Sequence, residues 1–146
     1  MGKVVAINIS HEKGVVKTPV EKGVFIEDHG LTNDAHAGDW HRQVSLLGKE
    51  SVDKIKSMGL DNLVPGIFAE NILTEGIVLY QLPVGTRLQI GDTIQEVTQI
   101  GKKCHHGCEI YQKVGDCVMP REGIFTKVIK SGTVKPGDLI NIIQDS

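Results

Sequence analysis

Residues 84–100 read VGTRLQIGDTIQEVTQI, two runs rich in β-forming side chains that meet at the pair Gly91-Asp92. Glycine accepts a positive φ and aspartate bonds its own backbone, so this pair between two β runs predicts a hairpin turn. Residues 132–140 repeat the arrangement around a second pair, Gly137-Asp138. We therefore expect antiparallel strands joined by tight glycine turns in both places.

The whole chain has the composition of a β protein. It contains 16 Val and 16 Ile against 10 Leu and 4 Ala, and 17 of its 146 residues are Gly. β-branched residues favour strands, whereas Leu and Ala favour helices. We expect a single domain over residues 1–146, mostly β, folded as a closed or nearly closed β-barrel with one main helix and short helical turns.

Local patterns place the elements of this barrel. Strands are expected over residues 3–9, over 20–26 with a bulge at Gly23, and over 42–47, and a polar functional loop is expected over 27–41. The best helix is Lys49–Met58, where Val52, Ile55 and Met58 share one face and Gly48 stands as the N-cap.

Charge and hydropathy exclude several classes of protein. The 16 Lys and Arg nearly balance the 18 Asp and Glu, so we expect no nucleic-acid partner. No apolar run approaches the roughly 18 residues of a membrane span, and residues 1–5 lack a signal-peptide pattern. These patterns predict a cytoplasmic protein without a membrane partner.

The densest group of reactive residues is Lys102-Lys103-Cys104-His105-His106-Gly107-Cys108. Two lysines before Cys104 favour its thiolate, and a helical turn would place Cys108 on the same face. Three interpretations follow from these residues: a reactive thiol, a zinc or other soft-metal site, or buried structural cysteines. The metal interpretation needs a ligand from elsewhere, such as Cys117, because neighbouring residues cannot surround one tetrahedral ion.

A second group lies in the polar loop, at Asn33–Gly38 followed by His41-Arg42. Acid, imidazole and guanidinium groups at this spacing suit anion binding, and a solvated loop with turn-capping Asn and Asp is the alternative. Arg121 by itself suits a solvated loop, and Trp40 suits packing.

Several segments in order resemble the MOSC domain, the module at the C-terminus of molybdenum cofactor sulfurases. They are Asn33–Gly38 with Arg42–Leu46, Pro65–Ile72 with Gly76-Ile77, Val84–Asp92, Lys102–Cys104 and Gly132–Asp138. This chain carries Lys103 and His105 where many relatives have Pro and an aromatic residue around the cysteine. It also lacks the pyridoxal-phosphate module that would release sulfur from cysteine.

The resemblance implies a β-barrel that binds the molybdenum cofactor (molybdopterin) and transfers sulfur through a cysteine persulfide. Such a protein would act as a sulfur transferase. Cys104 is the expected sulfur carrier, with Cys108 as a second thiol. His36, Arg42, Lys102, Lys103 and Arg121 are expected to face the cofactor's anionic groups, and Glu70 and Asn71 to form the pocket wall or hold its backbone. No protein-bound metal is expected, and pyridoxal phosphate would sit on a partner desulfurase.

Two other functions fit the same residues. One is a non-catalytic zinc or soft-metal module built on Cys104, Cys108 and His105 or His106. The other is a molybdenum cofactor chaperone that transfers no sulfur. The expected partner is a cysteine desulfurase or a molybdoenzyme.

Overall fold

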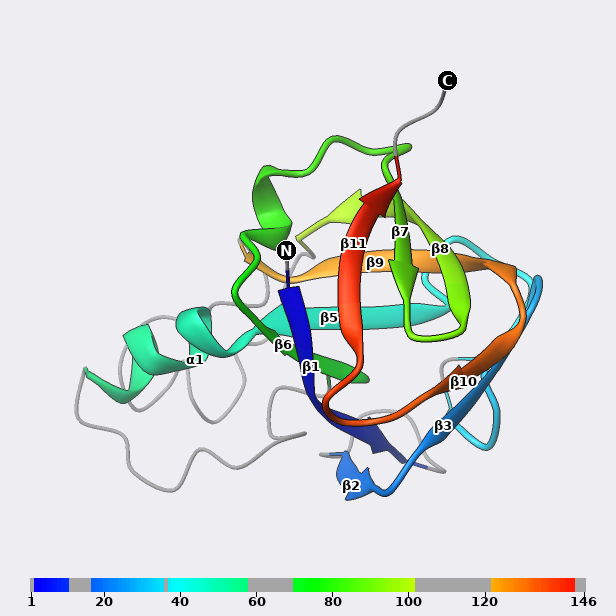
Figure 1. Cartoon of the computed structure of the whole chain (residues 1–146), viewed down its shortest axis with the longest axis horizontal. Coiled ribbons are helices and arrows are strands. Elements are labelled where there is room, and N and C mark those ends of the chain that lie inside the picture. The colour runs from blue at the N-terminus through cyan, green and yellow to red at the C-terminus, as the bar shows by residue number, and fades with distance from the viewer. Residues whose placement is uncertain (1, 11–16, 36, 58–69, 102–121, 144–146) are drawn as a thin grey trace.

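The β-rich composition is realised as a barrel of seven strands. A computed structural model of the chain describes residues 2–10, 17–35, 37–57, 70–101 and 122–143. Around the ring the strands are β11 (Leu139–Ile143), β7 (Arg87–Ile90), β8 (Thr93–Ile100), β9 (Ile124–Lys130), β5 (Val44–Gly48), β6 (Ile72–Glu75) and β1 (Gly2–Ile9). β11 also pairs with β1, which closes the ring and confirms the predicted barrel (Figure 1).

The remaining strands lie beside this ring. β2 (Thr18–Val20) pairs with β1, and a second sheet has the order β10 (Gly132–Val134), β3 (Gly23–Ile26), β4 (Gly30–Leu31). Neighbouring strands of the barrel are antiparallel except β5 and β6, which are parallel because α1 lies between them in the chain. The β-branched residues counted in the sequence fill the interior, among them Ile7, Ile72, Ile90, Val97, Ile124, Val128 and Ile140.

The predicted helix begins where the sequence indicated. α1 covers Lys49–Lys56 with Gly48 as its N-cap, and Val52 and Ile55 are buried. It ends before Met58, because Ser57 forms the C-cap and its hydroxyl donates to the Lys54 carbonyl at 2.6 Å. A short 3-10 turn, η1 (Leu79–Gln81), is one of the expected short helical turns.

Two expectations for the N-terminal third are wrong in detail. Residues 20–26 are not one strand with a bulge, because β2 ends at Val20 and β3 starts at Gly23 in a different sheet. Gly23 is needed for close packing, since a Cβ there would lie 2.7 Å from the Leu31 side chain and 3.0 Å from that of Ile7. The loop expected over residues 27–41 also contains β4.

The two Gly-Asp pairs have different tertiary roles. Gly91-Asp92 joins β7 to β8 in the predicted hairpin. Gly137-Asp138 does not form a hairpin, because β10 pairs with β3 while β11 pairs with β7 and β1. The second pair is instead a corner where the chain passes from the small sheet to the barrel, and the Gly137 amide donates to the Val4 carbonyl at 2.8 Å.

Candidate functional site

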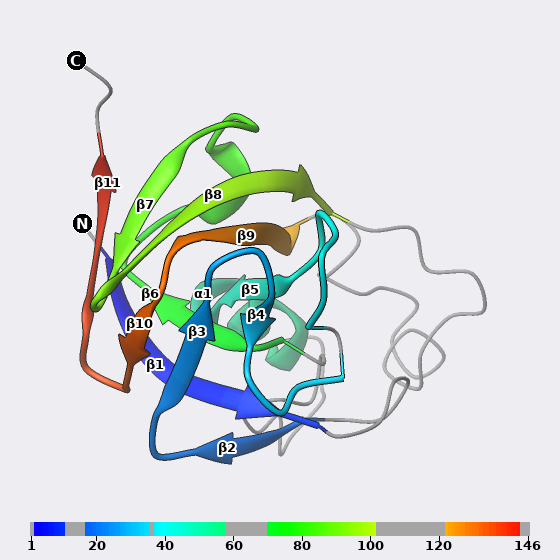
Figure 2. The same ribbon diagram turned by 90° about the vertical axis from the view of Figure 1, so that its right-hand side faces the viewer.

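Four strand termini meet along one row of paired residues that crosses the barrel wall. Ile100 pairs with Ile124, Ile124 with Leu46, Leu46 with Ile72, and Ile72 with Ile7. β8 ends on this row at Ile100 and β1 ends two residues past it at Ile9, whereas β9 and β6 begin on it. Figure 2 shows these termini on the same side of the barrel. Ser10 and Gly101 follow the ends of β1 and β8 in the chain, and Glu70 precedes the start of β6 by two residues. We call the row of paired residues, with the strand termini beside it, the rim.

The residues predicted to form a site are divided between the part of the chain that the structure describes and the part that it does not. Arg42, Glu70 and Asn71 belong to the described residues. His36, Lys102, Lys103, Cys104, Cys108 and Arg121 lie outside them, as do His105, His106 and Cys117. The helical turn expected after Cys104 lies outside them too.

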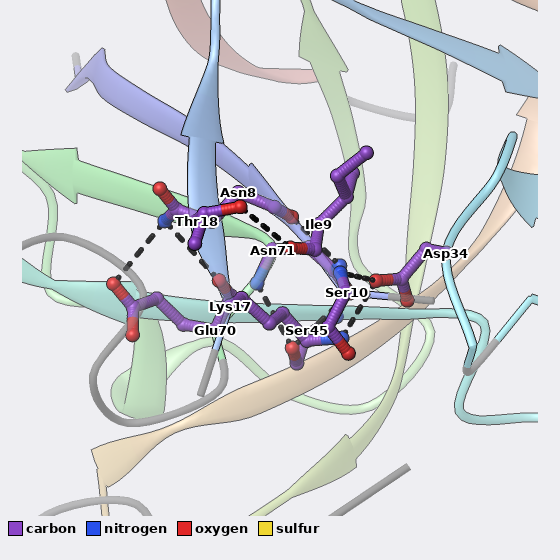
Figure 3. Close-up of polar contacts among 9 residues, drawn as sticks. All are labelled: Asn8, Ile9, Ser10, Lys17, Thr18, Asp34, Ser45, Glu70 and Asn71. Carbon is purple, nitrogen blue, oxygen red and sulfur yellow. Dashed lines mark hydrogen bonds and ion pairs between the residues drawn. The ribbon is translucent and has the colours of Figure 1, made fainter. Parts of the chain in front are cut away.

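Asn71 holds the backbone beneath the rim. Its side-chain oxygen accepts hydrogen bonds from the Ser45 amide at 3.0 Å and the Ser45 hydroxyl at 3.2 Å (Figure 3). Its Nδ2 donates to the Asn8 carbonyl at 3.1 Å. Asn71 is completely buried, so these bonds replace those it would make with water. They join the end of β1 to the starts of β5 and β6.

Glu70 lies on the other side of this junction. The buried Asn8 side chain donates through Nδ2 to the Glu70 carbonyl at 3.2 Å and to its carboxylate at 3.3 Å. Among the described residues, the buried Asn8 side-chain oxygen has no hydrogen-bond partner. Glu70 is only 1% exposed. The Glu70-Asn71 pair thus anchors the start of β6, because both side chains form hydrogen bonds under the rim.

A buried ion pair extends the network to the polar loop. Lys17 Nζ lies 2.7 Å from Asp34 Oδ1, and neither side chain has exposed surface. The Ser10 amide donates to the same oxygen at 3.1 Å, and the Ala35 amide donates to the Ser10 carbonyl at 2.8 Å. The loop is therefore tied to the end of β1 beside the Asn71 contacts.

The charge state of Asp34 follows from these contacts. Burial alone raises the pKa of this carboxyl group, but the hydrogen bonds from Lys17 and the Ser10 amide, together with the positive charge of Lys17, outweigh burial and lower it. Asn71 adds a smaller contribution in the same direction. Asp34 is thus ionised at neutral pH and holds Lys17 by charge as well as by hydrogen bonding.

Arg42 has a different environment, on the surface next to the rim. Its Nε donates to Gln99 Oε1 at 3.1 Å, and its guanidinium carbon lies 5.4 Å from the centre of the Phe125 ring and 6.0 Å from that of Trp40. Gln99 also contacts His41 Nε2 at 3.1 Å and donates to the Gly101 carbonyl at 2.7 Å. Arg42 is therefore linked through Gln99 to the last described residue before the segment that carries Cys104.

A separate cavity of about 140 Å³ lies beside α1. Its walls include Gly48, Ser51, Lys54, Tyr80 and Glu122. Lys54 donates to the Glu122 carboxylate at 2.9 Å, and the Ser51 hydroxyl donates to the same oxygen at 2.6 Å. The cavity includes neither Arg42 nor Glu70 nor Asn71 among its lining residues, so it is distinct from the rim.

Comparison with known families identifies this architecture. The family model described as MOSC domain matches residues 33–141, which is three quarters of the chain and includes part of the polar loop and the rim residues of β5, β6, β8 and β9. The chain belongs to the MOSC domain family. This family is associated with the molybdenum cofactor. Among curated protein sequences, none matches this chain.

Solved structures with the same fold include the YuaD protein from Bacillus subtilis, which is 21% identical with a TM-score of 0.72. The similarity covers 96% of this chain and 94% of YuaD. YiiM from Geobacillus stearothermophilus is 19% identical with a TM-score of 0.71, over 99% of this chain and 76% of that protein. YiiM from Escherichia coli is 16% identical with a TM-score of 0.71, over 100% of this chain and 71% of that protein. These likenesses establish a shared MOSC fold.

Three residues beside the MOSC rim were not predicted from the sequence: Asn8, Lys17 and Gln99. Asn8 carries a usable signal, because it is a polar residue in the apolar run Val4–Ile9 and therefore needs a buried partner. Lys17 and Gln99 carry no such signal, since Lys17 stands in a polar segment and Gln99 in the alternating pattern of β8. Their roles depend on Asp34 and Arg42, which are distant in the sequence.

The described part of this MOSC domain contains neither a metal-binding cluster nor a membrane-spanning helix. Within residues 2–10, 17–35, 37–57, 70–101 and 122–143, no three His, Cys, Asp or Glu side chains are arranged to hold a metal ion. The residues of the zinc alternative lie outside these ranges. In the same ranges, no helix has the length and apolar character required to traverse a lipid bilayer.

Proposed function

We propose that this MOSC domain binds the molybdenum cofactor and carries sulfur as a persulfide on Cys104. The observation that carries the proposal is the family match over residues 33–141, which includes His36, Arg42 and Cys104. When bound, the cofactor would supply its metal centre as the acceptor or donor of the sulfur atom. The chain's own residues would bind the cofactor, present the thiol and orient the partner's sulfur.

The described residues on either side of the segment that carries Cys104 support this role. Ile100 pairs with Ile124, and the Gly101 amide donates to the Gly123 carbonyl at 2.6 Å. Both ends of the intervening chain are thus anchored to adjacent strands, and the first of them, Gly101, lies three residues before Cys104. Lys102 and Lys103 directly precede this cysteine and favour its thiolate, the form that attacks sulfur.

Arg42 fits the phosphate group that a molybdopterin carries. Its guanidinium is oriented by Gln99 and Phe125, and a planar guanidinium binds phosphate oxygens through paired hydrogen bonds. His36, Lys102, Lys103 and Arg121 are proposed as further cofactor contacts. Glu70 and Asn71 would support the site from below, because their hydrogen bonds fix the strand ends at the rim.

Sulfur loading needs a partner but no added oxidant. The Cys104 thiolate attacks the outer sulfur of a persulfide on a cysteine desulfurase, whose pyridoxal phosphate released that sulfur from free cysteine. The S–S bond of the donor breaks, the donor cysteine leaves as a thiolate, and a new S–S bond forms on Cys104. The reaction exchanges one disulfide-type bond for another, so no net oxidation occurs.

Intact-protein mass spectrometry after incubation with a cysteine desulfurase and cysteine tests this proposal. The wild type should gain the mass of one sulfur atom, and a reductant should remove it. Cys104→Ala should abolish the gain, whereas the matched variant Cys117→Ala should keep it. Persulfide that persists in Cys104→Ala and vanishes in Cys108→Ala would assign the role to Cys108.

Two results would favour the alternative functions. Absence of persulfide together with a copurified pterin would support a chaperone that transfers no sulfur. Stoichiometric zinc in protein purified without chelator, lost in Cys104→Ala and Cys108→Ala, would support the metal module. Either result would refute sulfur transfer by Cys104.

A further inference from the structure

Two arginines of this chain use their Nε atoms in the same way but with different acceptors. Arg87 Nε donates to a carboxylate oxygen of Glu96 at 3.3 Å, which forms an ion pair. Arg42 Nε donates to the amide oxygen of Gln99 at 3.1 Å. A carboxylate both orients a guanidinium and neutralises its charge, whereas a neutral amide orients it and leaves the charge intact.

Among the residues that the structure describes, the rest of the Arg42 environment also leaves its charge uncompensated. Its other contacts in the described residues are the faces of the Phe125 and Trp40 rings, at 5.4 Å and 6.0 Å. No carboxylate in the described part of the chain lies within ion-pair distance of it. Aromatic faces restrict the guanidinium plane without accepting from its terminal nitrogens. Those nitrogens form the edge that binds two oxygens of one anion.

Gln99 suits this position because it donates and accepts at once. Its Oε1 receives the Arg42 Nε–H, and its Nε2 donates to the Gly101 carbonyl at 2.7 Å. The donation to Gly101 fixes which end of the amide faces Arg42, since the reversed amide would bring two donors together. A glutamate could accept from Arg42 but could not donate to Gly101, and it would neutralise the arginine.

We infer that Gln99 is a positioning residue that holds Arg42 as a charged clamp for a phosphate monoester or a similar tetrahedral oxyanion. The inference deepens the proposed function and rests on it for the natural ligand, where the phosphate belongs to a molybdopterin. The clamp itself consists of Arg42, Gln99, Phe125 and Trp40. Its binding of a simple phosphate requires no cysteine.

The test is a titration of the full-length protein with inorganic phosphate and with phenyl phosphate at about pH 8, where phosphate is mostly a dianion. Affinity is measured by calorimetry, and the ¹⁵N–¹H signal of Arg42 Nε reports its orientation. We expect both probes to shift that signal and Arg42→Gln to abolish binding. Gln99→Glu should keep the Nε hydrogen bond but weaken phosphate affinity roughly tenfold, because it neutralises the clamp.

Two further variants separate charge from orientation. Gln99→Leu keeps the charge of Arg42 but releases Nε, so affinity should fall severalfold and the Nε proton should exchange faster. Glu96→Gln gives Arg87 a neutral acceptor on the exposed surface, and phosphate binding should remain as in the wild type. Thermal midpoints show which variants are folded.

Three outcomes would overturn the inference: no phosphate binding by the wild type, unchanged binding in folded Arg42→Gln, or unchanged binding in folded Gln99→Glu. Each is distinguishable from failure of the proposed function. Persulfide formation on Cys104 is measured without phosphate, and Cys104→Ala should bind both phosphate probes like the wild type. If the protein binds phosphate but forms no persulfide, the inference about the clamp holds and only the proposed sulfur transfer fails.

Discussion

Lys17 and Arg42 are both cations near the rim, and the fold treats them in opposite ways. Lys17 is completely buried and lies 2.7 Å from the Asp34 carboxylate. Arg42 is half-buried and meets a neutral amide and two aromatic rings. A buried charge without a partner is costly, whereas a surface charge remains solvated without one. The comparison separates Lys17, whose charge is used within the fold, from Arg42, which we propose as an anion-binding residue.

The largest expected effect follows from breaking the buried pair. Asp34→Asn keeps the shape of the side chain but removes the carboxylate charge that lies 2.7 Å from the buried Lys17 ammonium group. We expect the free energy of unfolding, measured by urea denaturation, to fall by about 3–5 kcal/mol. Adding Lys17→Met should recover much of this loss. A loss below about 1 kcal/mol in Asp34→Asn would show that the pair does not stabilise the rim.

The same comparison predicts a pH dependence. Because the folded state lowers the pKa of Asp34 from its ordinary 3.8, its contribution is complete above that ordinary value. The contribution is lost as pH falls through the still lower folded pKa. The stability difference between wild type and Asp34→Asn should therefore be constant from neutral pH to about pH 5 and shrink below about pH 4. Urea denaturation across this range measures it.

A smaller effect is expected from the uncharged part of the network. Asn71→Ala removes the acceptor for the Ser45 amide and the donor to the Asn8 carbonyl, two groups at a buried junction. We expect a loss of about 2–4 kcal/mol in urea denaturation, since each buried group left unpaired costs about 1–3 kcal/mol. Ser45→Ala is the matched control, and it should cost less because two bonds between these residues remain, from the Asn71 amide to the Ser45 carbonyl and from the Ser45 amide to the Asn71 side chain. Equal losses in the two variants would contradict this account of Asn71.

The smallest effect is expected at an exposed ion pair. Lys135 Nζ lies 3.0 Å from Asp138 Oδ1, but the lysine side chain is 67% exposed. The hydrogen bond to Asp138 raises the pKa of Lys135, yet water screens the interaction. Lys135→Ala should leave the urea midpoint unchanged within error. Asp138→Ala should lower it, because Asp138 also accepts the Lys135 backbone amide at 3.0 Å.

Part of the candidate site could be predicted from the sequence. Arg42, Glu70 and Asn71 were identified through the family pattern, and each has polar contacts at or beside the rim. Gln99 could not be found in this way, because nothing local distinguishes it from Gln95 in the same strand. Gln95 is buried and accepts from the Thr126 hydroxyl at 2.6 Å. The two glutamines make different hydrogen bonds because they face different neighbours in the fold.

The sequence by itself determined the local structure of this protein. The β-branched runs made strands, Gly48 preceded the helix, and Gly91 and Gly137 both have positive φ values, +54° and +96°, as their turns require. These features follow from side-chain shape and backbone sterics over a few residues, so they can be recognised without knowing the fold.

Only the tertiary structure decided which segments became partners. The Gly-Asp pairs are alike in sequence, yet one closes a hairpin and the other a corner between sheets. Likewise, Asp34 received Lys17 as its partner and Arg42 received Gln99, across separations of 17 and 57 residues. Barrel closure brings distant side chains together, and the free energy of burial then requires that buried charges be paired while surface charges need not be.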